Sequence, residues 1–273
     1  MDRCLFAFLL ALLPVALAGG GDAPATPPDP SPAELKRQAE RCRHILKTSL
    51  IDFYLPACVD PEHGGYFESL RDGKFVATGE KFLVLQARQL WFFSTLAQQG
   101  TRKEAALSAA KSGFDFLQNH MSDRRHGGYY AKVSDAGEVK DPRKHVYLNA
   151  FALYGLVAYH RASGDDRALA AARDLFRILE EKAHDRRNGG YGEFFTADWQ
   201  PITDPKEPGY VGAIGTKTYN THLHVMEALT ICIARGPIRS CASAWPSCWS
   251  STRTRRATPI TIAISTAGGQ TGE

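Results

Sequence analysis

The sequence predicts an all-α fold, a toroid of helical hairpins (an α/α barrel) with short β-hairpins between the helices. The main observation is a repeat: the tripeptide Gly-Gly-Tyr begins at Gly64, Gly127 and Gly189, at intervals of 63 and 62 residues. Each copy follows an amphipathic helical stretch, which is typical of an outer helix. Each copy also precedes a short two-stranded pattern and then a helical stretch that is apolar almost all round, which is typical of a buried inner helix.

The N-terminal segment has the pattern of an export signal. Residues 1–18 combine a basic start, an apolar run and a small-residue end, so we expect a signal peptide and an exported protein, periplasmic or secreted. Residues 19–30 are rich in proline and glycine and are expected to form a flexible leader. Folding should begin near Ser31, an expected N-cap with Glu34 three residues later.

Length and charge limit the classes of function. Residues 31–230 suffice for one domain with a sizeable core. The formal net charge of +4 comes entirely from the stretch after Ile231, which holds five arginines and one acid. The domain before it is neutral, so the sequence favours neither a nucleic-acid partner nor a membrane surface after signal removal. The oligomeric state is left open.

Each repeat predicts the same local structure. After Gly64 the run GGYFESL-RDG-KFVAT reads as a hairpin with Asp72-Gly73 at its turn, and looser copies follow the other two Gly-Gly-Tyr sites. The paired glycines should supply positive φ angles, and the tyrosine should pack behind them. Residues 165–183 predict an outer amphipathic helix, whereas the stretches 81–97 and 144–160, each starting at a lysine, predict inner helices.

Alignment of the inner helices on Lys81, Lys144 and Lys217 identifies candidate site residues. Positions three and seven after the lysine share one helix face, which should point to the barrel axis. These axial positions hold Val84, Tyr147, Asn220, Arg88, Phe151 and His224. A guanidinium buried in an apolar helix needs anionic or strongly polar company, such as a sugar oxyanion.

Each candidate also has a structural interpretation. An arginine of this kind often reaches solvent, and a histidine or tyrosine on an apolar face is often a satisfied core residue. The coincidence of four polar residues, Arg88, Tyr147, Asn220 and His224, on axial positions favours a site. His222 points away from His224 and no third ligand follows, so no metal site is expected.

The segments KFLVLQARQLWFFS, KHVYLNAFALYGL and KTYNTHLHVMEAL, together with the Gly-Gly-Tyr hairpins, resemble the N-acylglucosamine 2-epimerase superfamily. Asn220-Thr221-His222-Leu223-His224 with Glu227 is most similar to its cellobiose 2-epimerase branch. The resemblance implies an (α/α)6 barrel that epimerises a sugar at C2 without a cofactor, on cellobiose-type oligosaccharides or N-acylglucosamine. It also implies that Arg88 stabilises an enediolate, that Tyr147 and Asn220 line the sugar and that His224 is a catalytic acid/base.

The chemistry and the end of the sequence set further expectations. Imidazole is a suitable base for removing the C2 proton near neutral pH, but inversion needs a second acid/base group on the other face. The family supplies it from a later Gly-His-Asp-Ile-Glu motif, which this sequence lacks. Residues 231–273 show no helical period and are expected to be a disordered or frameshifted tail. The sequence therefore predicts half a barrel over residues 31–230, poorly stable and inactive.

Two other functions stay open. A sibling branch of the superfamily interconverts aldose and ketose through the same enediolate. A non-catalytic, exported sugar-binding remnant would keep Arg88, Tyr147 and Asn220 without a second base. Glycoside cleavage would need two opposed carboxylates, which the axial positions do not offer, so it ranks last.

Overall fold

The computed structural model describes residues 29–234; the predicted signal peptide, nearly all of the leader and the tail beyond residue 234 lie outside the described residues. The chain divides into two compact units, Met1–Ile45 and Leu46–Glu273. The described part of the first unit is helix α1 (Pro32–Ile45). Its predicted N-cap is confirmed, because the Oγ atom of Ser31 accepts a hydrogen bond from the backbone N–H of Glu34 at 3.2 Å.

The second unit holds helices and very short strands, so the predicted all-α class is confirmed. Its elements, where η marks a short π-helix, are in chain order η1 (Leu46–Ile51), α2 (Asp52–Tyr54), β1 (Ser69–Arg71), β2 (Lys74–Val76), β3 (Lys81–Phe82), α3 (Leu83–Gln98), α4 (Lys103–Phe116), η2 (Leu117–Met121), β4 (Lys132–Val133), β5 (Val139–Asp141), β6 (Lys144–His145), α5 (Val146–Ser163), α6 (Asp166–Ile178), η3 (Leu179–Ala183), β7 (Phe194–Phe195) and α7 (Tyr219–Ala234).

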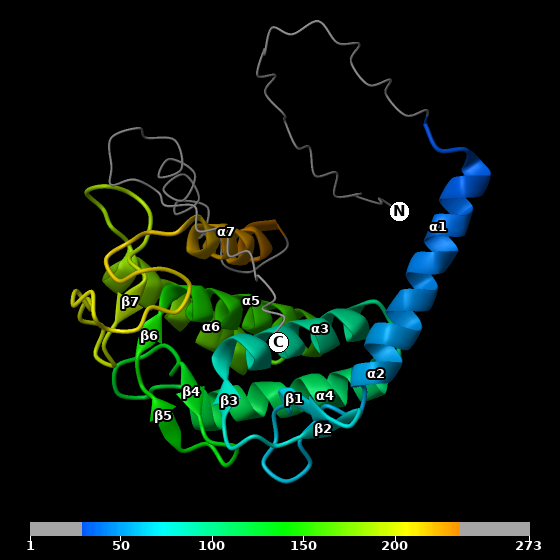
Figure 1. Cartoon of the computed structure of the whole chain (residues 1–273), viewed down its shortest axis with the longest axis horizontal. Coiled ribbons are helices and arrows are strands. Elements are labelled where there is room, and N and C mark those ends of the chain that lie inside the picture. Colours follow the sequence, from blue (N-terminus) through cyan, green and yellow to red (C-terminus); the bar gives the residue numbers. More distant parts are fainter. Residues whose placement is uncertain (1–28, 235–273) are drawn as a thin grey trace, which may run out of the picture. The chain divides into compact units, whose positions relative to one another are not determined.

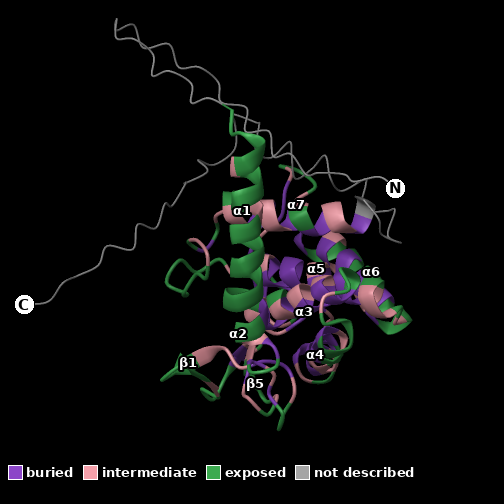
Figure 2. Ribbon diagram, turned by 90° about the vertical axis from the view of Figure 1, so that its right-hand side faces the viewer, coloured by how far each residue is buried: buried purple, intermediate pink, exposed green. Residues whose placement is uncertain are grey.

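The helices form the two predicted layers. In the inner layer α5 packs between α3 and α7, and α4 and α6 pack outside α3 and α5 (Figure 1). Helix α5 is almost wholly buried, whereas α6 alternates buried and exposed residues, as its amphipathic sequence requires (Figure 2). Gly155 lets α3 and α5 approach closely, since a Cβ atom there would lie 2.8 Å from the carbonyl oxygen of Ala87. The described helices do not close into a barrel.

The hairpins confirm the repeat. Strands β1 and β2 pair antiparallel across a turn at Asp72 and Gly73, whose φ angles are 51° and 72°. Strands β4 and β5 form the second hairpin, and β4 also pairs with β3. The third copy is irregular, because β7 pairs with β6 and only bridges back to the chain at Pro201.

The inner helices begin two residues later than predicted. Lys81 and Lys144 lie in strands β3 and β6, and Lys217 precedes the first residue of α7 by two positions. The physical reason is that each lysine side chain forms an ion pair with an aspartate of the same repeat, which holds the lysine outside the helix.

Candidate functional site

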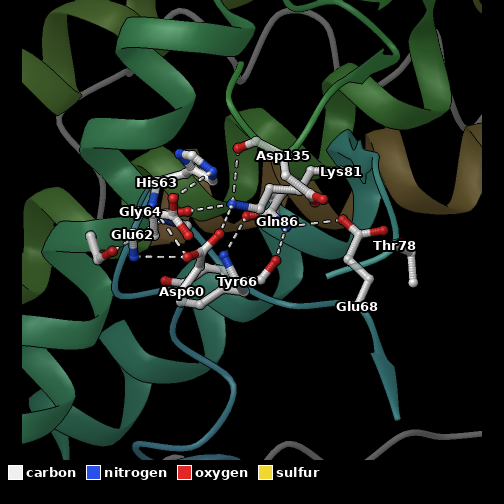
Figure 3. A network of polar contacts seen from close by, with 12 residues as sticks. Asp60, Glu62, His63, Gly64, Tyr66, Glu68, Thr78, Lys81, Gln86 and Asp135 are labelled. Carbon is white, nitrogen blue, oxygen red and sulfur yellow. Dashed lines mark hydrogen bonds and ion pairs between the residues drawn. The ribbon is translucent and has the colours of Figure 1, made fainter. Parts of the chain in front are cut away.

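Three lysine–aspartate pairs fix the ends of the inner helices. The Nζ atoms of Lys81, Lys144 and Lys217 lie 2.7, 2.8 and 2.5 Å from the carboxylates of Asp60, Asp123 and Asp185. Lys81 also donates to the carbonyl oxygen of Gly64 at 2.6 Å (Figure 3). The pairs therefore tie each Gly-Gly-Tyr loop to the start of the inner helix that follows it.

The first two pairs are deeply buried and the third is not. The side chains of Lys144 and Asp123 are 0% and 2% exposed, whereas those of Lys217 and Asp185 are 30% and 25% exposed. Burial alone would raise the pKa of Asp123, but hydrogen bonds from Lys144 and from the N–H groups of His126 and Arg125 hold that pKa below its usual range. The Asp123 carboxylate is thus charged at neutral pH, while burial lowers the pKa of Lys144 against the opposing effect of its hydrogen bond to Asp123.

A second contact recurs five residues after each lysine. The side chains of Gln86, Asn149 and His222 accept a hydrogen bond from the backbone N–H of the tyrosine in Gly-Gly-Tyr, at 2.9, 2.9 and 3.0 Å. In the third repeat the acceptor is Nε2 of His222, while its Nδ1 lies 2.8 Å from the carbonyl oxygen of Thr218. His222 is therefore a structural counterpart of two amides, held in one neutral tautomer, and it points away from His224 as the spacing predicted.

Replacing His222 tests this assignment. We expect His222→Ala to lower the free energy of unfolding by about 1–3 kcal/mol, because the buried N–H of Tyr191 loses its acceptor. We expect His222→Asn, which copies Asn149 of the second repeat, to recover most of that loss. Thermal and urea unfolding of both variants would check this, and equal destabilisation by Ala and Asn would contradict it.

The predicted axial residues converge on Phe151. The guanidinium carbon of Arg88 lies 5.2 Å from the centre of the Phe151 ring, and the His224 ring lies 4.5 Å from it. The Tyr147 ring stands edge-on to both, at 5.2 Å from Phe151 and 5.1 Å from His224. Helices α3, α5 and α7 thus bring three of the four predicted site residues together. Asn220 lies one helical turn before His224, and in the described residues no hydrogen bond joins it to the others.

Arg88 is exposed, which corrects the expectation of a buried guanidinium. Helices α4 and α5 cover most of α3, which accounts for the apolar sequence of α3. The face of α3 that carries Arg88 is left open to solvent. The side chain meets the face of Phe151, a cation–π contact. Sequence composition predicted the burial of α3 as a whole and could not tell which face stays uncovered.

Glu227 belongs to the site, although the sequence motif that contains it did not predict a role for it. Its Oε2 atom lies 2.7 Å from Nδ1 of His224, one turn away on α7. With the proton on Nδ1 shared with this carboxylate, Nε2 of His224 keeps a free lone pair and can act as a base. The sequence could have indicated this contact, because His224 and Glu227 are three residues apart and so share one helix face. Burial raises the pKa of Tyr147, with Arg88 opposing and Glu227 adding to the shift, so its hydroxyl stays protonated.

Glu68 is a second residue whose role the sequence did not predict. Its Oε1 atom accepts hydrogen bonds from the N–H of Phe82 at 2.6 Å and from Nε2 of Gln86 at 2.9 Å (Figure 3). Glu193 repeats the first of these contacts with the N–H of Thr218. Burial raises the pKa of Glu68 to about 7, against the opposing hydrogen bonds. Glu68 therefore satisfies an N–H group at the start of α3 and changes charge near neutral pH.

The raised pKa of Glu68 predicts a pH-dependent stability. In the unfolded chain a glutamate has a pKa of about 4.3, so the folded state holds an extra proton between about 4.3 and 7 and loses stability as the pH rises through that range. Glu68→Gln keeps the acceptor oxygen and removes the charge. We expect this variant to be more stable than the native chain by roughly 2 kcal/mol at pH 8 and equal to it at pH 4. Urea unfolding at both pH values checks this; a difference independent of pH would contradict it.

Two features are absent from residues 29–234. No group of three histidine, cysteine, aspartate or glutamate side chains in this range is arranged to hold a metal ion. No helix in the same range is long and apolar enough to cross a membrane.

Comparison with known proteins gives consistent matches. Residues 64–236 match the model of the N-acylglucosamine 2-epimerase (GlcNAc 2-epimerase) family. The chain is 33% identical over 186 residues to a cellobiose 2-epimerase of Bacteroides fragilis, covering 68% of this chain and 47% of that protein. It is 30% identical over 190 residues to a D-mannose isomerase of Marinomonas mediterranea, covering 68% and 43%.

A solved structure agrees with the fold. The cellobiose 2-epimerase of Spirochaeta thermophila superposes with a TM-score of 0.73 at 35% identity, covering 82% of this chain and 56% of that one. The chain spans about half the length of the curated relatives it matches.

Proposed function

This chain belongs to the N-acylglucosamine 2-epimerase family, and we propose that its site around Phe151 binds the reducing end of a carbohydrate and moves the proton at C2 through an enediolate, without a cofactor. The observation that carries the proposal is the placement of His224. Glu227 holds its Nδ1, and its ring faces Tyr147 and Phe151, beside which Arg88 lies. The names of the relatives suggest cellobiose-type disaccharides as substrates.

The residues of the site have complementary roles in this reaction. Nε2 of His224 takes the C2 proton from the open-chain aldose. Arg88 stabilises the negative charge that develops on O1 and O2, and the protonated hydroxyl of Tyr147 donates to a sugar oxygen. Asn220 offers an amide to a neighbouring hydroxyl. Because Arg88 is open to water, its electrostatic contribution is weaker than that of a buried guanidinium.

Inversion at C2 requires a proton delivered to the opposite face of the enediolate. The family resemblance assigns this step to a histidine in a motif that the sequence does not contain. We therefore expect His224 to remove and return the proton on one face, which exchanges the C2 hydrogen with solvent without forming the epimer. Inactivity in net epimerisation stays a prediction.

Incubation with cellobiose or mannose in D2O, followed by proton NMR, tests the proposal. Loss of the H2 signal without a new sugar is the expected result. If the chain neither exchanges the C2 hydrogen nor binds either sugar in calorimetry, the proposed function is overturned. Binding without exchange would identify a non-catalytic sugar-binding protein. Formation of the C2 epimer would refute the predicted inactivity.

Aldose–ketose isomerisation is the second candidate, favoured by the similarity to a D-mannose isomerase. It uses the same enediolate but returns the proton to C1. The products from mannose separate the two reactions, since epimerisation yields glucose and isomerisation yields fructose.

Export through residues 1–18 is also a proposal. Expression with the native N-terminus and sequencing of the mature protein tests it: we expect a chain that begins after Ala18, and an intact Met1 start would contradict export by cleavage.

A further inference from the structure

Each repeat is joined to the next by one strand pair. Strand β3 of the first repeat pairs with β4, which follows the second Gly-Gly-Tyr, and β6 of the second repeat pairs with β7, which follows the third. Beside the first pair, the N–H of Leu83 at the start of α3 donates to the carbonyl oxygen of Ala131 at 3.0 Å. Beside the second, the N–H of Val146 at the start of α5 donates to that of Glu193 at 3.1 Å. The junction between repeats therefore recurs in one register.

Among residues 29–234 the third repeat makes no junction of this kind. Lys217 and Thr218 stand at the positions of β3 and β6, but no described strand pairs with them. The N–H of Tyr219, the first residue of α7, likewise lacks the corresponding acceptor in this part of the chain. The Tyr219 residue is 57% exposed. These three residues form an open edge, which we call the trailing edge, and unpaired backbone of this type is a template for another strand.

Strand β1 has the complementary free edge. It follows the first Gly-Gly-Tyr as β4 follows the second, and among the described strands it pairs with β2 alone. Leu70, in the middle of β1, is 48% exposed, and Phe53, whose ring lies 5.3 Å from that of Phe75 in β2, is 38% exposed. Leu46 and Leu50, on the helical turns before Phe53, are also exposed. Several exposed apolar side chains beside an unpaired strand indicate an interaction surface.

The repeat specifies what fits the trailing edge. Both filled junctions use the strand that follows Gly-Gly-Tyr in the next repeat. The whole sequence contains three copies of Gly-Gly-Tyr and none after residue 234, and β4 and β7 are already paired. Strand β1 is the remaining one, but it lies on the opposite side of the Leu46–Glu273 unit from α7 (Figures 1 and 2). A β1 strand that reaches the trailing edge must therefore come from another copy of the chain.

We propose that two copies of this chain associate about a two-fold axis, with the trailing edge of each copy paired to β1 of the other. The internal junctions set the register: Thr218 opposes Ser69 of the second copy. The N–H of Tyr219 then donates to the carbonyl oxygen of Glu68 in that copy. Because each copy uses both of its edges, the two junctions are identical and the assembly closes. Three repeats from each copy give six, as in the (α/α)6 barrel that the family resemblance implies.

Sedimentation equilibrium of the full chain tests the association. The chain has a mass of 30.0 kDa, so we expect a species of about 60 kDa, measured over about 1–100 μM because association depends on protomer concentration. Leu70→Lys places a charge in each junction and should raise the dissociation constant at least about tenfold. The matched control is Val139→Lys. Val139 is 45% exposed on β5, which takes part in no described junction between repeats, so the dissociation constant should stay unchanged.

A pair of cysteine variants tests the register. Ser69→Cys and Thr218→Cys place thiols at opposed positions of the proposed junction, where facing Cα atoms of antiparallel strands are about 4.5–5.5 Å apart, within reach of a disulfide. Under mild oxidation, a mixture of the two single variants should form a chain-to-chain disulfide between these two positions, identified by peptide mass spectrometry. Each variant alone should not form it.

The outcomes are decisive for this surface. A monomer throughout the concentration range would overturn the proposal. A dimer that Leu70→Lys and Val139→Lys weaken equally would also overturn it, because association would then use another surface. Absence of the Ser69–Thr218 cross-link in a dimeric mixture of the two cysteine variants would contradict the strand register. None of these measurements involves a sugar, so their results are separate from those that test the proposed function.

Discussion

Replacing Lys144 with methionine is expected to lower the free energy of unfolding by about 3–5 kcal/mol, because it leaves the Asp123 carboxylate buried without its cation. Methionine keeps the length and the apolar stem of lysine, so the change isolates the ammonium group. Urea unfolding at pH 7 measures the effect.

The third repeat supplies the control. Lys217→Met removes the same contact from a pair whose side chains are 30% and 25% exposed, so its expected cost is about 1 kcal/mol. The pH dependence gives a second check. The pKa of Asp123 is lowered in the folded state, so the contribution of the pair is complete above about pH 3.9 and is lost as the pH falls further. Equal effects of the two variants would show that burial does not set the strength of these pairs.

The repeat made much of the fold predictable from the sequence. Gly-Gly-Tyr could be recognised because its glycines have φ angles near +70°, which other residues rarely adopt. The aspartates four residues before each Gly-Gly pair were an equally regular signal. Their pairing with the lysines could not be derived from helical periodicity, because each lysine lies before the helix it was assigned to, Lys81 and Lys144 in short strands and Lys217 in a loop.

The site was predictable in part. Alignment of the inner helices on their lysines placed Arg88, Tyr147 and His224 on equivalent faces of three helices. The structure brings these residues together around Phe151. The exposure of Arg88 depends on which neighbours cover α3, and this information lies in distant parts of the chain. The raised pKa of Glu68 likewise comes from burial between elements that are separate in sequence.

Replacing His224 with alanine is expected to slow exchange of the C2 hydrogen by about 10²- to 10⁴-fold, the usual contribution of a general base. Sugar binding should persist, because Arg88, Tyr147 and Asn220 remain. The measurement is loss of the H2 signal of cellobiose in D2O, with calorimetric binding recorded in parallel.

A matched histidine on the same helix makes this result interpretable. His222→Asn changes the imidazole two residues away, which contacts the Gly-Gly-Tyr backbone and not the axial face, so exchange should continue at the native rate. Glu227→Gln should lie between the two, because the amide can still accept from Nδ1 of His224 but no longer supports a positive charge on the ring. Undiminished exchange in His224→Ala would place the base elsewhere, while a loss of exchange in His222→Asn with the fold intact would mean that the third repeat positions α7 for catalysis through that contact.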